Sequence, residues 1–332
     1  MKLYKKLVIT LFTTLITLHA STITPSTQTI SAFPNPQNLI TIKANIKYLD
    51  NDIDIFNDIG SSKRDNFGHI GKLFGADLNF RYGYSKHISF LYNFGINKFD
   101  YIDSSLNNTK NELIARVNIY DVPSYIFDLF TIDIGVSRNS GDSVDIKNTN
   151  AISKITDISK QNGSYLQLSD MSDNSFFIKA IWGNRFASSI LNIFSSIKYT
   201  NISTTLNFKP KTDNNIDLGR DEKTLGAGIN FVTESENFIY DINYRYLRVF
   251  SRGISNTNEN HNNIFGLDIS YKANRSLLLY FGGNIMLNGY NGVIPYLFNR
   301  YSKDSFDRYG FVKIGLVYNF KVDSDLLYRN SY

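Results

Sequence analysis

Apolar and polar residues alternate along most of the chain after Asn38, in segments of about ten residues. The clearest case lies at 238–246, where Phe238, Tyr240 and Ile242 alternate with Asp241 and Asn243. Successive side chains of a β-strand point to opposite sides, so this pattern gives each strand one apolar and one polar face. Aromatic residues on one face and charged residues on the other predict strands that separate two different solvents.

We predict twelve such strands. They lie at 40–48, 76–85, 88–96, 113–119, 130–136, 176–182, 191–199, 225–231, 238–246, 265–271, 277–287 and 310–320. None of the six prolines falls in the middle of a proposed strand. This is consistent with backbone ladders that need every N–H group, as they do in lipid.

The predicted connections alternate in length. The short ones lie at 85–87, 121–124, 186–189, 233–237 and 273–276, and the long ones at 49–75, 97–111, 138–174, 201–224, 251–263 and 289–309. A soluble β-sandwich has no reason to sort its turns in this way, whereas membrane barrels have short periplasmic turns and long outward loops. We therefore predict an all-β, antiparallel transmembrane β-barrel of about twelve strands, with both chain ends on the short-turn side.

The first residues predict export from the cytoplasm. Lys2, Lys5 and Lys6 precede the uncharged run 7–18 and then Ala20, the pattern of a secretory signal peptide, with cleavage favoured after Ala20. We expect a signal peptide at 1–20, a Ser-, Thr- and Pro-rich periplasmic linker at 21–37, the barrel at 38–320 and a short tail at 321–332. The expected location is the outer membrane of a Gram-negative bacterium.

Composition narrows the function. Without the three signal-peptide lysines, 32 basic residues remain against 30 acidic ones, a formal charge of about +2, and no basic block suggests nucleic acid as a partner. The absence of Cys excludes disulfides and thiolate chemistry. The chain has 22 Tyr and 25 Phe but a mean hydropathy of only −0.23. This combination suits a barrel with outward aromatic girdles and a polar interior.

The last predicted strand carries a short motif. Residues 313–320 follow the order polar-x-Gly-x-x-aromatic-x-aromatic, with Lys313, Gly315, Tyr318 and Phe320 at its defined positions. The motif resembles the C-terminal β-signal of Gram-negative outer-membrane β-barrels, including small porins. The resemblance implies that the barrel assembly machinery and outer-membrane lipid are partners. Such barrels usually end on the final aromatic, whereas here 321–332 follow, which we interpret as a tail after Phe320.

The polar face of the strands would line the lumen. The predicted lumen residues are Lys43, Lys47, Asp77, Arg81, Glu112, Arg116, Asp133, Lys179, Arg185, Lys198, Asp241, Arg245, Asp268, Lys272 and Lys313. The basic excess predicts a passive porin or small-solute channel that mildly favours anions. The same charges could instead pair across a narrow barrel and plug it, because twelve strands lie between filled and open sizes.

Two other functions stay open. A non-conducting structural or adhesin-like barrel would use its long loops as a contact surface. A rim lipid hydrolase would resemble outer-membrane phospholipases that use Ser, His and Asn. Only His69 and His261 lie on the outer side, and neither has the His-x-Ser-type arrangement on a strand that this chemistry needs, so we expect no enzyme.

We expect no cofactor or metal either. Asp50, Asp52 and Asp54 are spaced like the start of a calcium loop, but Ile55 and Ser61 occupy the positions that need Gly and Glu. Two predicted loops could fold into the barrel mouth. They are the unusually apolar stretch 293–298 and the long loop 138–174.

Overall fold

The computed structural model describes residues 31–33, 35–49, 70–101, 104–121, 127–146, 165–186, 188–209, 216–217, 219–252, 260–287 and 308–321. The barrel strands are β1 (Leu39–Leu49), β2 (Ile70–Gly83), β3 (Ile88–Tyr101), β4 (Ser104–Asp121), β5 (Leu129–Gly141), β7 (Tyr165–Phe186), β8 (Ser189–Lys209), β10 (Arg220–Glu234), β11 (Phe238–Arg252), β12 (Asn260–Lys272), β13 (Leu277–Leu287) and β14 (Arg308–Lys321). Two short strands, β6 (Val144–Ile146) and β9 (Ile216–Asp217), extend the sheet beyond the barrel wall. This described part of the chain contains no helix long and apolar enough to cross a membrane.

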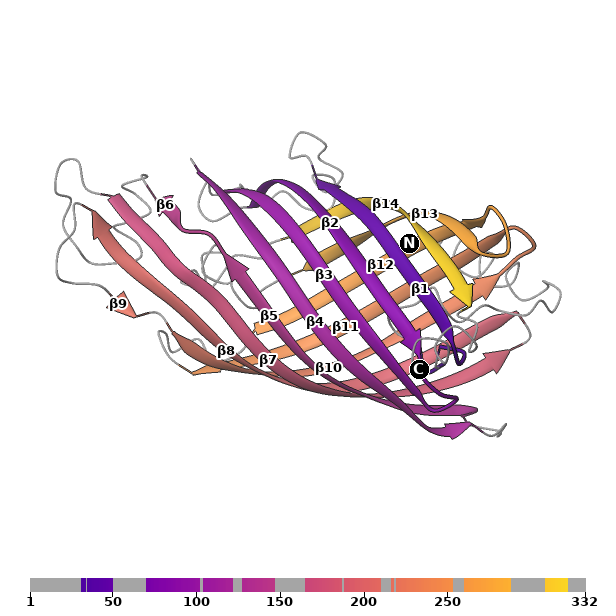
Figure 1. The fold of residues 1–332 in the computed structure, drawn as a ribbon. Helices are drawn as coiled ribbons and strands as arrows, with labels where there is room; N and C mark the ends of the chain where they lie inside the picture. The colour runs from indigo at the N-terminus through magenta and orange to yellow at the C-terminus, as the bar shows by residue number, and fades with distance from the viewer. Residues whose placement is uncertain are drawn as a thin grey trace, which may run out of the picture.

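The strands form one closed barrel (Figure 1). Consecutive barrel strands pair antiparallel, and the first strand pairs with the last, from Leu39 opposite Lys321 to Tyr48 opposite Val312. This closure leaves no open edge in the ring of twelve barrel strands, which is the condition for a sheet to cross a membrane. The predicted fold class, a transmembrane antiparallel barrel of twelve strands, is confirmed.

The strands are longer than their apolar periodicity predicts. Strand β7 covers 165–186 where alternation predicts 176–182, and β8 covers 189–209 where it predicts 191–199. The segment 97–111 was a predicted loop, yet β3 continues to Tyr101 and β4 begins at Ser104. These extensions carry Asn, Ser, Thr and Lys on both faces, so a pattern that marks an apolar face ends before the backbone pairing does.

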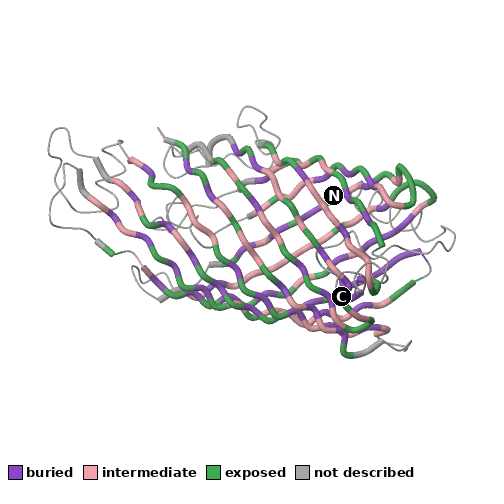
Figure 2. Tube along the Cα trace, in the orientation of Figure 1, coloured by how far each residue is buried: buried purple, intermediate pink, exposed green. Residues whose placement is uncertain are grey.

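The barrel wall has two distinct faces, seen as alternating colours along every strand in Figure 2. Large apolar side chains lie exposed on the outside; Ile197 is 65% exposed and Ile314 is 64% exposed. Their neighbours along the strand are buried or half-buried and polar. Exposed apolar residues in such numbers are costly in water but stable against lipid.

Aromatic rings cover glycines on the inner face. Phe177 of β7 lies over Gly135 of β5, where an added Cβ would overlap the ring. Tyr280 of β13 lies over Gly315 of β14 in the same way, with its ring 2.8 Å from the position of a Cβ. The missing side chains make room for the rings against the wall, which gives Gly315 of the predicted β-signal a packing role.

The segment before β1 lies inside the barrel at its short-turn end. Ser31 and Ala32 are fully buried. The Ala32 N–H donates to Asn192 Oδ1 of β8 at 3.0 Å, and the Thr131 hydroxyl of β5 donates to the Ala32 carbonyl. The Asn35 N–H donates to Ser89 Oγ of β3 at 3.1 Å. Contacts to several walls at once place this segment within the ring of strands.

An apolar core surrounds that segment. Phe33 is 5% exposed and clusters with Ala32 and with inward residues of seven strands, namely Leu129, Ile181, Ile190, Phe194, Val232, Ile239, Leu278, Tyr280 and Val317. We call residues 31–33 and 35 the N-terminal plug. Part of the predicted 21–37 linker therefore fills the barrel end. The predicted signal peptide and residues 21–30 lie outside the described residues.

Candidate functional site: the charged lumen

The predicted lumen residues all lie on barrel strands, on the face opposite the exposed apolar residues. Two of them lie at the short-turn mouth. Arg185 is exposed at the end of β7, with its guanidinium 4.4 Å from the centre of the Phe33 ring. Lys272, near the end of β12, forms an ion pair with Glu234 and donates to the Ser235 carbonyl at 3.1 Å. Whether the set lines a solute path stays a prediction.

The most buried ion pair joins β4 to β5. Arg116 donates from Nε to Asp133 Oδ1 at 2.7 Å and from a second nitrogen to Oδ2 at 2.8 Å. Their side chains are 2% and 0% exposed. A bidentate geometry of this kind satisfies both carboxylate oxygens, which offsets the cost of removing the two charges from water.

A second group crosses the inside of the wall. Asp268 of β12 pairs with Lys313 of β14 at 2.7 Å and with Lys43 of β1 at 3.5 Å. Strands β13 and β14 separate β1 from β12 in the barrel, so this contact spans the concave inner surface. Lys43 also lies 4.3 Å from the centre of the Tyr280 ring, a cation–π distance.

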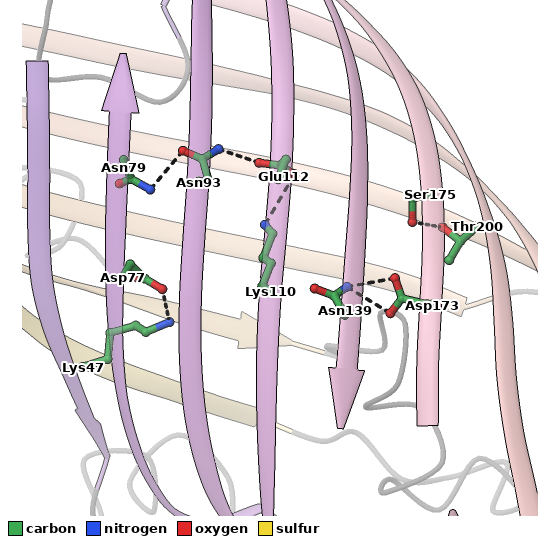
Figure 3. Close-up of polar contacts among 10 residues, drawn as sticks. All are labelled: Lys47, Asp77, Asn79, Asn93, Lys110, Glu112, Asn139, Asp173, Ser175 and Thr200. Atoms are coloured by element: carbon green, nitrogen blue, oxygen red, sulfur yellow. Dashed lines mark hydrogen bonds and ion pairs between the residues drawn. The ribbon is translucent and has the colours of Figure 1, made fainter. Parts of the chain in front are cut away.

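A hydrogen-bonded ladder follows strands β2 to β4 (Figure 3). Asn79 donates to Asn93 at 3.0 Å, and Asn93 donates to Glu112 at 2.6 Å. Glu112 also pairs with Lys110 at 3.5 Å. On the neighbouring wall Lys47 donates to Asp77 at 2.8 Å.

Charge also acts across the lumen. Arg81 of β2 lies within electrostatic range of Asp133 on β5 and of Asp241 on β11. These acidic residues belong to well-separated parts of the wall, so charged side chains from distant strands act on one another across the lumen. A narrow charged lumen is the expected interior of a barrel between the eight-stranded and sixteen-stranded sizes.

Some inward charges were not predicted from the sequence. Following the alternation into the longer strands adds two basic and three acidic positions, namely Lys110, Arg220, Asp173, Glu222 and Glu234. Arg220 and Glu222 pair at 2.7 Å, and Asp173 accepts from Asn139 at 2.9 Å. Most lay in predicted loops, and continuing the two-residue period past the last apolar residue would have found them.

Three basic side chains of the lumen form no ion pair with any residue that the structure describes. Within the part of the chain that the structure describes, no carboxylate lies within ion-pair distance of Lys179, Lys198 or Arg245. Lys179 Nζ lies 5.8 Å from the centres of the Phe177 and Phe194 rings. The buried Nε of Arg245 has no hydrogen-bond partner. Most lumen carboxylates pair with other basic side chains, so these three bases are balanced only from a distance, Lys179 by Asp133, Lys198 by Asp173 and Arg245 by Asp241.

One carboxylate departs from that rule. Asp241 accepts a hydrogen bond from Asn230 Nδ2 at 2.5 Å and lies within electrostatic range of Lys43 and Lys313. Those two lysines already pair with Asp268. Asp241 therefore lies between the lysine-rich group on β1, β12 and β14 and Arg245 of its own strand, which is also within its electrostatic range.

The histidines give no hydrolytic arrangement in the described ranges. His261 is exposed on the outer face of β12, where Nδ1 lies 2.5 Å from the Tyr246 hydroxyl and the two rings stack. No cluster of three or more His, Cys, Asp or Glu residues suitable for a metal occurs among the residues that the structure covers. His69, the aspartates at 50, 52 and 54 and the apolar stretch 293–298 lie outside those residues.

Comparison with known proteins supports the fold class. No protein-family model and no curated protein matches the sequence. The structure is similar to the translocator domain of the autotransporter NalP from Neisseria meningitidis, with a TM-score of 0.51 and 10% identity over 86% of this chain and 90% of that one. LpxR from Salmonella typhimurium matches at 0.45, with 8% identity over 84% and 99%. The KdgM porin matches at 0.38, with 10% identity over 84% and 99%.

At these identities the similarity concerns the fold alone. The closed antiparallel barrel, its outward apolar face and its neighbours define the class: a β-barrel of the Gram-negative outer-membrane type. This confirms the resemblance to outer-membrane β-barrels at the level of the fold, while the β-signal of the last strand stays a prediction. There Lys313 pairs with Asp268, while Tyr318 and Phe320 lie exposed on the outside with ring centres 5.9 Å apart. Recognition by the assembly machinery stays a prediction.

Proposed function

We propose that the protein is an outer-membrane channel for small solutes with a preference for anions. The observation that carries this proposal is the contrast between paired carboxylates and the unpaired Lys179, Lys198 and Arg245. Charge that a wall does not neutralise is felt by a solute in the lumen, because low-dielectric walls focus the field. An uncompensated basic wall raises the local concentration of anions.

The energetic cost of these bases also favours a transport role. A purely structural interior is more stable with apolar residues or with fully paired charges, since an unpaired charge in a confined interior is poorly solvated. Ionisable residues kept inside a membrane protein commonly mark the route of an ion or solute. Lys179, Lys198 and Arg245 fit this role better than that of a scaffold.

The N-terminal plug makes the resting channel closed at its short-turn end. Phe33 and Ala32 occupy the centre of the apolar core, so a solute passes only when the plug leaves this position. The same observation favours the rival function, a non-conducting structural barrel. Removal of the plug separates the two functions, because only a channel then conducts.

Solute uptake by proteoliposomes tests the proposal. We expect liposomes containing the plug-deleted barrel, without residues 21–35, to admit small anions faster than cations of equal size. The double variant Lys179→Glu, Arg245→Glu should reverse this order and leave the uptake of a small neutral sugar unchanged. Lys98→Glu, on the exposed outer face of β3, is the matched control and should behave as the parent.

The outcome can also contradict the proposal. A barrel that is folded, as judged by its circular dichroism and its mobility on unheated gels, yet admits no solute after plug deletion is no channel. An anion preference that persists in the Lys179→Glu, Arg245→Glu variant would show that these two residues do not determine the selectivity.

A further inference from the structure

We propose that the inner wall formed by β7, β8, β10 and β11 contains a binding site for a small, doubly charged oxyanion of the phosphate type. This proposal deepens the proposed channel function and rests on it for its physiological meaning. The site, which we call the oxyanion recess, consists of Lys179, Lys198 and Arg245 around Ser196 and Gly226.

Strand register brings these residues together. Lys179 of β7 lies opposite Ser196 of β8, which lies opposite Gly226 of β10. Lys198 is the next inward residue along β8 after Ser196. Directly opposed residues have Cβ atoms about 5 Å apart and diagonal ones about 7–8 Å, so long side chains on adjacent inward positions reach a common point.

Arg245 completes the group from the other side. It lies opposite Gly228 of β10, the inward residue next to Gly226. Arg245 and Lys179 lie within electrostatic range of each other, although two strands separate β7 from β11. The basic groups therefore flank the Ser196–Gly226 floor from β7, β8 and β11.

The floor of the recess is formed by residues with small side chains or none. Gly226 has no side chain, and the Ser196 hydroxyl occupies the space that a Cβ at Gly226 would need. The neighbouring Gly228 is covered by the Phe194 ring, 2.5 Å from the place of its Cβ. Small residues therefore form the floor between the long basic side chains, with the Leu247 side chain 3.0 Å from the place of the Gly226 Cβ and the Phe194 ring toward the short-turn end.

The recess has donors that the protein does not use. Arg245 Nε is buried without an acceptor. The side chains of Ser196, Lys179 and Lys198 have no hydrogen-bond acceptor in the described ranges. Buried donors are almost always satisfied in native proteins, so the unsatisfied Arg245 Nε indicates an absent acceptor, and the half-buried donors of Ser196, Lys179 and Lys198 lie on the same stretch of wall.

The surrounding carboxylates do not fill that role. Asp133 and Glu112 lie within electrostatic range of Lys179, Asp173 of Lys198 and Asp241 of Arg245. Each already has another partner: Asp133 accepts from Arg116, Asp173 from Asn139 and Asp241 from Asn230, while Glu112 accepts from Asn93 and pairs with Lys110 (Figure 3). The bases of the recess are thus balanced from a distance and have no direct ionic contact within the described residues. A doubly charged oxyanion matches both the charge and the donors, because guanidinium and ammonium groups bind phosphate oxygens strongly.

Calorimetric titration of inorganic phosphate into the refolded mature protein in detergent tests the site. We expect saturable binding, which Lys179→Gln and Arg245→Gln should each weaken by about tenfold, the usual effect of one lost charge-assisted bond. Lys223→Gln, on the exposed outer face of β10, is the matched control and should bind as the parent. Potassium chloride at equal ionic strength should give no saturable heat.

A second variant probes the shape of the recess without changing its charge. Gly226→Ala puts a methyl group against the Ser196 hydroxyl and should weaken phosphate binding, with the fold checked by circular dichroism. No saturable heat with the parent protein, or equal binding by parent, Lys179→Gln and Arg245→Gln, overturns the site. Anion-selective uptake without phosphate binding would refute the oxyanion site and support the channel. Phosphate binding to a barrel that never conducts would refute the channel and support the oxyanion site.

Discussion

Replacement of Phe33 by Ala should open the barrel. Phe33 is 5% exposed and packs in the apolar core at the short-turn end, together with Ile181, Phe194 and Val317. Removing a buried Phe side chain costs about 3–5 kcal/mol in a packed core. In the released plug the Phe33 ring is exposed to water and makes no packing contacts. The substitution therefore destabilises the docked state by nearly the whole of this free energy and leaves the released state almost unchanged.

The expected size follows from that energy. Each 1.4 kcal/mol changes an equilibrium constant about tenfold, so the ratio of released to docked plug should rise at least about a hundredfold. Three anchoring hydrogen bonds to the wall remain, because Ala32 still donates to Asn192 and accepts from Thr131, and Asn35 still donates to Ser89. The plug should therefore exchange between docked and released positions.

Single-channel recording in planar bilayers measures this exchange. The parent should be closed most of the time, Phe33→Ala should show frequent openings, and the protein without residues 21–35 should stay open. Tyr84→Ala is the matched control, since Tyr84 is an aromatic residue near the same end but lies 60% exposed on the outside. Equal open times in the parent, Phe33→Ala and the deletion would refute the assignment of residues 31–33 and 35 as a plug.

Two further predictions concern the wall. Arg116→Ala leaves the fully buried Asp133 without its partner and should lower the free energy of unfolding by about 3–5 kcal/mol, measured by urea unfolding in lipid vesicles; a loss below about 1 kcal/mol would mean that the pair is solvated. Gly135→Val pushes against the Phe177 ring and should cost about 1–3 kcal/mol in the same assay, whereas Gly135→Val combined with Phe177→Ala should recover part of that loss. Independent, additive effects of these two changes would contradict the packing of the ring on the glycine.

The barrel itself could be predicted because membrane strands lie between lipid and a polar interior. Outward residues such as Ile197 and inward ones such as Lys198 alternate for that reason, and the alternation reports both the strand and its face. The strand ends were underestimated because beyond the lipid both faces meet water, and Lys110 and Asp173 then look like loop residues. The periodic signal depends on lipid contact and the backbone pairing does not.

Partners across the barrel could not be predicted. Lys43 and Asp268 are far apart in sequence and meet only because the first and last strands close the ring. The plug was missed for a similar reason. A stretch rich in Ser and Pro predicts a linker, and the burial of Phe33 depends on inward residues contributed by seven strands.

The most direct test of the account is the reversal potential of the plug-deleted barrel across a tenfold gradient of potassium chloride in a planar bilayer. The unpaired Lys179, Lys198 and Arg245 predict a reversal potential with the sign of the chloride equilibrium potential. In the Lys179→Glu, Arg245→Glu variant it should shift toward the potassium equilibrium potential. A folded barrel that carries no current, or one that prefers potassium before any charge is changed, would contradict the anion channel.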